Sequence, residues 1–217
     1  MTTTPPRSRV PALIGVIVVV VLVLAGGLYA LKVLNKDHVA LIGDSVTDIT
    51  KPELHGELDG QHVIDVEAVG GMEVAQMQGA ADTAAAAGPD QVVINLGTND
   101  VIHGKDMGAA AKGIEDMAAK FPKQRCVHLV TVNEGMFSTE GKDLTTPARQ
   151  LNQAIKQLAL TKGYHVVDWA DIAAKYAAAG EPNGHLTSDT IHPDVVGRKM
   201  LADAIRESVD LCKLAPL

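Results

Sequence analysis

Aromatic residues, cysteines and clusters of positive charge are all scarce in this sequence. Only 3% of the residues are Phe, Trp or Tyr, so a core has to be built mainly from aliphatic side chains. Lys and Arg number 19 against 26 Asp and Glu, and the basic residues are scattered, which argues against nucleic-acid binding. No Cys/His spacing is typical of a metal site and no glycine-rich loop is typical of a phosphate site, so we expect no metal and no cofactor.

The chain has two cysteines, Cys126 and Cys212. An exported domain with an even number of cysteines can form a disulfide, and this one would pin the last predicted helix to the predicted sheet. The alternative is two buried thiols, which are common in protein cores. We favour the disulfide Cys126–Cys212.

Residues 12–34 form a long apolar segment, of which 12–31 carry no charge. About twenty such residues span a bilayer as a helix. Arg7 and Arg9 precede the segment, so the positive-inside rule predicts a cytoplasmic tail at 1–11, a membrane anchor at 12–34 and an exported domain at 35–217. The protein would then be a single-pass protein of the cell membrane. The alternative is a cleaved signal peptide and a secreted domain.

Strand and helix patterns alternate from residue 38 onward. Short runs of branched aliphatic residues predict strands at 38–42, 62–69, 91–96, 126–132 and 164–167. Apolar residues at helical spacing, with Gly or Pro near the ends, predict helices at 72–87, 107–120, 147–162, 170–179 and 194–211. The segment after the first strand, through Pro52 to Gly60, is interpreted as a polar loop.

This alternation predicts an α/β fold, a three-layer doubly wound sandwich with a five-stranded parallel sheet. If the strand order is the flavodoxin-like 2-1-3-4-5, the first strand lies between the second and third. The residues that follow these three strands then become neighbours, and they include Ser45, Gly70 and Asn99. Ligands of such sheets bind beyond the carboxyl ends of the strands, so a hydroxyl, a glycine and an amide are brought together where a substrate can reach them.

Four motifs in this domain resemble the four blocks of SGNH (GDSL-type) hydrolases, in the family's order and over residues 38–211. They are Gly43-Asp44-Ser45, a glycine after the second strand, Gly97-Thr98-Asn99-Asp100 and Asp189-Thr190-Ile191-His192-Pro193. The sequence departs from the family after the serine, where Val46 and Thr47 stand in place of an early glycine. Spacing favours Gly70 over Gly71 as the glycine of the second block.

The resemblance implies acyl transfer through a serine. Ser45 would be the nucleophile, His192 the general base and acid, and Asp189 the group that orients the imidazole. The backbone N–H groups of Ser45 and Gly70, with the side chain of Asn99, would form the oxyanion hole. Three flanking residues are assigned to substrate binding: Asp44, Gly71 and Thr98. Asp44 is also expected to bond to neighbouring loop backbone, and His103 and His185 are further residues that could contact a substrate.

The sequence therefore predicts an extracytoplasmic serine esterase that removes acetyl or other short acyl groups, with an acylated envelope carbohydrate or a small ester as its substrate. One alternative is an O-acetyltransferase with a membrane acyltransferase as its partner, because Gly-Asp-Ser-Val and Val167-Asp168-Trp169 look similar to the extracytoplasmic SGNH domains of such enzymes. Another is a non-catalytic envelope-binding module on the same fold. The sequence does not indicate an oligomeric state.

Overall fold

Five parallel strands form one sheet in the order β2-β1-β3-β4-β5, which confirms the predicted fold and strand order. The structure is a computed structural model that describes residues 36–122, 126–178 and 186–214. The strands are β1 (Asp37–Gly43), β2 (His62–Ala68), β3 (Gln91–Asn95), β4 (Cys126–Val130) and β5 (His165–Val167).

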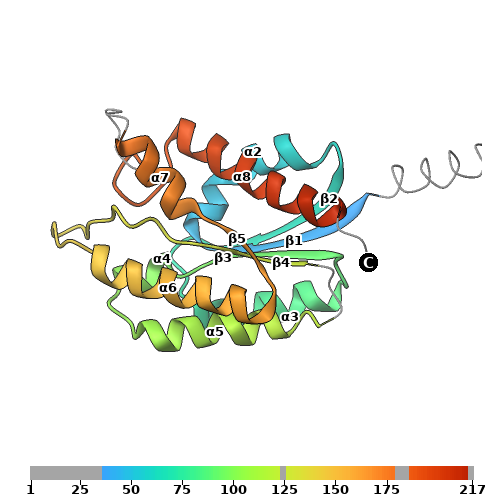
Figure 1. The fold of residues 1–217 in the computed structure, drawn as a ribbon, viewed down its shortest axis with the longest axis horizontal. Coiled ribbons are helices and arrows are strands. Elements are labelled where there is room, and N and C mark those ends of the chain that lie inside the picture. The colour runs from blue at the N-terminus through green and yellow to red at the C-terminus, as the bar shows by residue number, and fades with distance from the viewer. Residues whose placement is uncertain (1–35, 123–125, 179–185, 215–217) are drawn as a thin grey trace, which may run out of the picture. The chain divides into compact units, whose positions relative to one another are not determined.

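Helices cover both faces of the sheet and complete the three layers (Figure 1). One face is covered by α2 (Ser45–Leu58), α7 (Trp169–Ala178) and α8 (Val195–Leu214). The other is covered by the 3-10 turn η1 (Val74–Met77) and by α3 (Gln78–Ala86), α4 (Thr98–Ile102), α5 (Met107–Ala119) and α6 (Thr145–Lys162).

Strand β1 supplies side chains to both layers of the core. Val39 and Leu41 pack with residues of α2 and α8, whereas Ala40 and Ile42 pack with residues of α3, α5 and α6. All four are at most 2% exposed. Strands of a parallel sheet that are buried on both faces have continuous aliphatic runs, and for this reason the strands were predictable from the sequence.

The segment that follows β1 is a helix, and the prediction of a polar loop there is wrong. Asp44 caps α2 by accepting the N–H of Val46 at 3.0 Å. Pro52 lies inside the helix, where proline costs about 3 kcal/mol. Burial outweighs this cost, because each large apolar side chain that is buried contributes about 1.5–3 kcal/mol. The buried stripe recurs every fourth residue, at Val46, Thr50, Leu54 and Leu58.

Two further elements differ from prediction. The predicted helix at 72–87 begins later, as η1 followed by α3, and Glu73 and Gln76 form a capping box at the start of η1. The short helix α4 was not predicted, because five residues are too few to establish a helical period.

The predicted anchor at 12–34 and tail at 1–11 lie outside the residues that the structure describes. Within 36–122, 126–178 and 186–214, no helix is both long enough and apolar enough to span a bilayer.

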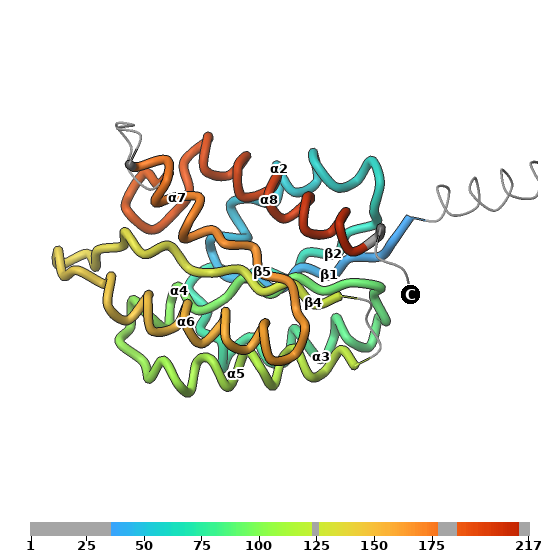
Figure 2. Tube along the Cα trace, in the orientation of Figure 1, coloured from blue at the N-terminus to red at the C-terminus, as the bar shows by residue number. Residues whose placement is uncertain are grey.

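Cys126 and Cys212 form a disulfide between the first residue of β4 and the last turns of α8. The two Cα atoms are 6.2 Å apart and the residues are separated by 86 positions in sequence. The bond lies at the amino ends of the strands. The start of β1 and the end of α8 therefore lie at the same end of the sheet (Figure 2).

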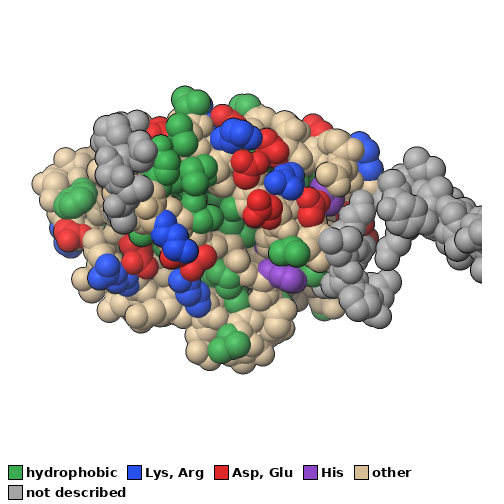
Figure 3. All heavy atoms as spheres, turned by 45° about the horizontal axis from the view of Figure 1, so that its top comes forward, with side chains coloured by type: hydrophobic (Ala, Val, Ile, Leu, Met, Phe, Trp, Pro, Cys, Tyr) green, Lys and Arg blue, Asp and Glu red, His purple; other side chains and the backbone are tan. Residues whose placement is uncertain are grey.

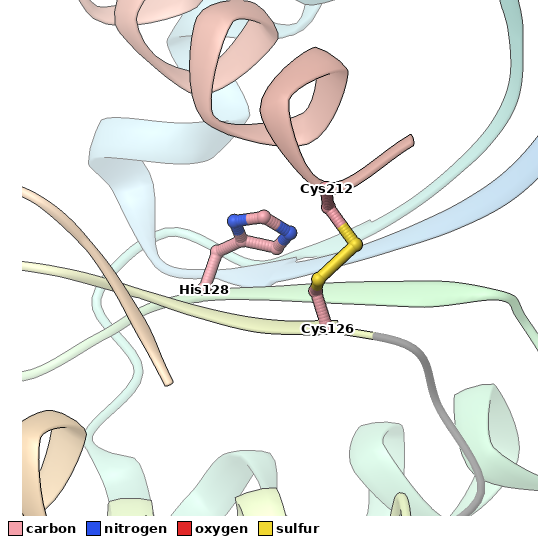
Figure 4. A group of neighbouring side chains, drawn as sticks. All are labelled: Cys126, His128 and Cys212. Atoms are coloured by element: carbon pink, nitrogen blue, oxygen red, sulfur yellow. A yellow bond between two sulfur atoms is a disulfide. The ribbon is translucent and has the colours of Figure 1, made fainter. Parts of the chain in front are cut away.

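His128 lies beside this disulfide in the core (Figure 4). Its Nδ1 is 2.7 Å from Ser208 Oγ and its Nε2 is 3.0 Å from Gln91 Oε1. Burial, with a smaller effect of the neighbouring His165, lowers the pKa of His128 to about 3, so the ring is neutral. Because the two sulfur atoms are bonded to each other, we assign the group Cys126, His128 and Cys212 a structural role.

Charges of both signs are interspersed on the surface over α2 and α8 (Figure 3). Arg198 pairs with Glu53 at 2.8 Å and Lys199 pairs with Glu57 at 2.9 Å, so each pair joins the two helices. The Lys199–Glu57 pair is the more exposed of the two, and exposed pairs contribute little stability individually. They give this face a mixed charge, unlike the basic surface of a nucleic-acid-binding protein.

Candidate active site

The loops that follow β1, β2 and β3 meet at the carboxyl edge of the sheet, as the predicted strand order requires. The N–H of Val69 donates to Gly43 O at 3.2 Å, which holds the second loop against the first. A Cβ atom on Gly70 would lie 3.7 Å from the Cβ of Ser45. The structure therefore brings Gly70 beside the serine.

The backbone around Ser45 is fixed by its neighbours. Ser45 is the first residue of α2 and is partly exposed, whereas Asp44 before it is buried. Gly43 must be a glycine, because a Cβ atom there would overlap the side chain of Thr47. A hydroxyl at the start of a capped helix, directly after a buried strand, is held in place by the sheet.

His192 lies between Ser45 and Asp189. Its Nε2 is 3.0 Å from Ser45 Oγ, and its Nδ1 is 2.7 Å from Asp189 Oδ2. We assign the tautomer in which Nδ1 donates to the carboxylate and Nε2 accepts from the hydroxyl, because a carboxylate can only accept. The structure thus brings together the three residues to which the sequence assigned catalysis.

Asp189 is held in its ionised form. Partial burial raises the pKa of its carboxyl, but hydrogen bonds from the ring and the N–H of His192 and from the N–H of Ile191 outweigh this effect, and the pKa is lowered. The two N–H groups donate to Oδ1 at 2.6 and 3.0 Å. A carboxylate with one oxygen fixed in this way presents the other to the imidazole.

Asn99 is oriented by the loop after β2. Its Nδ2 donates to Met72 O at 3.0 Å. Asn99 lies in α4, whose N-cap residue, Gly97, has φ +113°. A side chain at Gly97 would be strained and would contact Leu151, so the sharp turn into α4 depends on glycine.

Two buried carboxyls, Asp44 and Asp100, lie at this edge of the sheet. Asp44 is 0% exposed and accepts the N–H of Val46, and burial raises its pKa to about 7. Asp100 Oδ2 accepts the N–H of Val74 at 3.0 Å, and burial raises the pKa of this carboxyl also. The sequence did not predict the role of Asp100, although a carboxylate directly after a buried strand and a glycine is a signal for it.

Burial argues against one of the substrate-binding assignments. The side chain of Asp44 has no exposed surface, so it cannot contact a substrate in this conformation, whereas Thr98 is 4% exposed, similar to Asn99 at 6%, and its assignment remains a prediction. Gly71 is exposed, with φ +78°, and its assignment remains a prediction. His103 is exposed and its Nδ1 is 2.8 Å from Glu73 Oε1, whereas His185 lies outside the described residues.

Comparison with known proteins places this site in context. The model of the GDSL-like Lipase/Acylhydrolase family matches residues 41–200. A search among curated proteins found no match to the chain.

Solved structures share the fold. A putative acylhydrolase from Bacteroides fragilis has 21% identity and a TM-score of 0.69, over 83% of this chain and 89% of that one. The acetyl xylan esterase AlAXEase has 21% identity and a TM-score of 0.68, over 79% and 99% of the two chains. Axe2, an acetylxylan esterase from Geobacillus stearothermophilus, has 20% identity and a TM-score of 0.66, over 82% and 96%.

The family match covers the three loops of the carboxyl edge and the segment that contains Asp189 and His192. The resemblance that the four motifs indicated is thereby confirmed. The chain belongs to the GDSL-like lipase/acylhydrolase family and is an ester-hydrolysing enzyme.

Proposed function

We propose that the chain is a serine esterase in which Ser45 is the nucleophile and Asp189 and His192 complete a catalytic triad. The observation that carries this proposal is the pair of hydrogen bonds at His192, 3.0 Å to Ser45 Oγ and 2.7 Å to Asp189 Oδ2. Such a chain of contacts raises the reactivity of a hydroxyl and stabilises the imidazolium that forms when the proton is taken.

The reaction then proceeds in two acyl transfers. Ser45 Oγ attacks the ester carbonyl carbon while its proton passes to His192 Nε2, and the tetrahedral intermediate collapses when His192 donates that proton to the leaving alcohol. Water attacks the resulting acyl-serine, with His192 taking the water proton. The acid is released and Ser45 recovers its proton from His192.

The oxyanion of each intermediate would be bound by the N–H groups of Ser45 and Gly70 and by Asn99 Nδ2. The proximity of Gly70 to Ser45, and the bond that orients the Asn99 amide through Met72 O, support this assignment. Donors that are already oriented need no reorganisation when the charge develops, which makes this stabilisation large.

The proposed substrate is an acetyl or other short acyl ester on a carbohydrate. Two of the structural neighbours carry the names of acetyl xylan esterases, and their folds extend over about four fifths of this chain.

We further propose that the catalytic domain acts outside the cytoplasm. The Cys126–Cys212 disulfide supports this location, because disulfides persist mainly in oxidising compartments. The apolar segment at 12–34 supports attachment to the cell membrane.

The test compares the full-length chain in detergent with its Ser45→Ala variant. We expect hydrolysis of p-nitrophenyl acetate and labelling by a fluorophosphonate in the first and a loss of at least about 1,000-fold in kcat in the second. Thr83→Val, which removes a hydroxyl from the exposed surface of α3, is the matched control.

A folded protein that is neither labelled by the fluorophosphonate nor active on the ester would overturn the catalytic proposal and favour a binding module. Transfer of the acetyl group to added sugar acceptors in preference to water would make the enzyme an acetyltransferase.

A further inference from the structure

Thr190 lies between Asp189 and His192 in an unusual backbone conformation. Its φ is +71°, in the left-handed region that favours glycine. A β-branched residue is strained there, and such strain persists only where surrounding contacts determine the conformation. The contacts of Thr190 therefore indicate which interactions hold it in this conformation.

The hydroxyl of Thr190 bonds to the backbone of Phe137 in two directions. Thr190 Oγ1 accepts the N–H of Phe137 at 3.0 Å and donates to Phe137 O at 3.4 Å. The two residues are 53 positions apart in sequence. Through these bonds, the catalytic histidine segment is attached to the segment 133–144, which joins β4 to α6.

The segment 133–144 is firmly anchored. The N–H of Leu144 donates to Met136 O at 3.0 Å, and both of these side chains are buried in the core. Phe137 and Asp143 form an antiparallel bridge that closes the segment. The backbone of Phe137 that bonds to Thr190 is thus held in place, although Phe137 as a residue is 45% exposed.

The turn from Asp189 to His192 is held together without Thr190. Asp189 Oδ1 accepts the N–H groups of Ile191 and His192, and the N–H of Ser188 donates to His192 O at 3.1 Å. The contact between the Asp189 carboxylate and the imidazole is internal to this turn. What the turn cannot set by itself is its position against the sheet, and hence the distance from His192 Nε2 to Ser45 Oγ.

We propose that Thr190 is a positioning residue whose hydroxyl fixes the turn against the segment 133–144 and thereby keeps His192 within hydrogen-bond distance of Ser45. The inference rests on the proposed function of Ser45 and His192. It predicts that loss of the hydroxyl misplaces the whole turn while Asp189 and His192 stay in contact. The chemical step then slows.

Three variants of Thr190 test the proposal in the full-length protein. Thr190→Val keeps the shape and removes the hydroxyl, and we expect kcat for p-nitrophenyl acetate to fall roughly 10- to 100-fold with KM unchanged. Thr190→Gly relieves the strain but also lacks the hydroxyl, so kcat should fall similarly without a loss of thermal stability. Thr190→Ser retains the hydroxyl and should stay within about threefold of the parent. Thr83→Val again serves as the matched control.

The pH profile separates positioning from a general loss of structure. In Thr190→Val the acid limb of kcat/KM should keep its midpoint, whereas Asp189→Asn, which alters the partner of the imidazole, should change it. Parent-like kcat in both Thr190→Val and Thr190→Gly would overturn the proposal, as would a failure of Thr190→Ser to restore activity. If Ser45→Ala keeps its turnover, it is the proposed function that fails, and the two failures are thus distinguishable.

Discussion

The amide of Asn99 is oriented by a single contact, its bond to Met72 O. Because that carbonyl can only accept, the contact identifies the nitrogen end of the amide. Nδ2 carries two hydrogens and donates one of them to Met72. The second is available to an oxyanion, so the structural bond and the proposed catalytic bond use the same atom.

Truncation of this amide should therefore reduce the rate and leave binding largely intact. For Asn99→Ala we expect a loss of roughly 100- to 1,000-fold in kcat, about 3–4 kcal/mol of transition-state stabilisation, with KM changed little. Steady-state hydrolysis of p-nitrophenyl acetate measures both constants. Gln157→Ala, which removes an exposed amide on α6, is the control. An equal rise in KM with kcat unchanged would mean that Asn99 binds the ground state and the transition state equally, which would contradict the prediction.

Asp44 makes the stability of the fold depend on pH. Its pKa is raised from 3.8 to about 7, so the folded protein favours the protonated form. The unfolded chain loses this proton near pH 3.8, and stability therefore falls as the pH rises from that value to about 7. Asp44→Asn replaces the titrating carboxyl by an amide, so this variant should lack the decline in stability with rising pH.

Urea unfolding at pH 4, 5.5 and 7.5 measures the effect. The free energy of unfolding of Asp44→Asn relative to the parent should rise by about 2–4 kcal/mol across this range, at about 1.4 kcal/mol per unit of pKa shift. Only the difference between the two proteins is informative, because carboxyls with lowered pKa values, such as Asp189, act in the opposite direction. A difference that is constant with pH would contradict the burial of Asp44.

At the level of the elements, the strands were predictable and the first helix was not. Buried parallel strands are apolar on both faces, so their sequences have continuous runs such as Val39–Ile42. Helix α2 buries a narrow stripe in which two of the buried residues, Thr47 and Thr50, are polar, and it contains a proline. Its helical period is therefore weak in the sequence and is determined by packing against the sheet and α8.

In the site, too, some residues could be predicted from the sequence and others could not. Ser45, Gly70 and Asn99 could be placed together because the strand order alone makes their loops neighbours. The burial of Asp44 could not be predicted, because Gly-Asp-Ser is also an ordinary exposed turn. Thr190 gave no signal at all, since its residue type is unfavourable for the conformation it adopts.

The turn into α4 requires glycine at position 97, and a substitution there tests this requirement. Gly97→Ala would force a side chain into φ +113° and against Leu151, and we expect a loss of roughly 2–4 kcal/mol in stability together with a loss of activity, because α4 carries Asn99. Gly56→Ala is the matched control. Gly56 is in α2, where an added Cβ meets nothing within 4 Å, so this change should stabilise by about 0.5–1 kcal/mol. Thermal unfolding of the two variants gives both values, and equal effects would contradict the account of Gly97.

At the scale of the whole molecule, the disulfide closes a long stretch of chain. With its cysteines 86 positions apart in sequence, the chain-entropy model gives about 4–5 kcal/mol of stabilisation, or roughly 10–15 °C in Tm. The double variant Cys126→Ser/Cys212→Ser should lose this amount, and kcat at a temperature where it is folded should not change, since the bond lies away from the catalytic edge. Reductant should lower the Tm of the parent and have no effect on the double variant. A parent whose Tm is insensitive to complete reduction would refute the prediction.

The parallel sheet places the catalytic edge and the start of β1 at opposite ends of the domain. Every strand delivers its following loop to the catalytic edge, while β1 starts, and α8 finishes beside Cys126, at the other edge (Figure 2). Asp37, the first residue of β1, therefore lies at the end of the sheet opposite Ser45, the first residue of α2. Substrates that are themselves large or immobile, such as polymers in a matrix, can approach the serine without meeting that end of the domain.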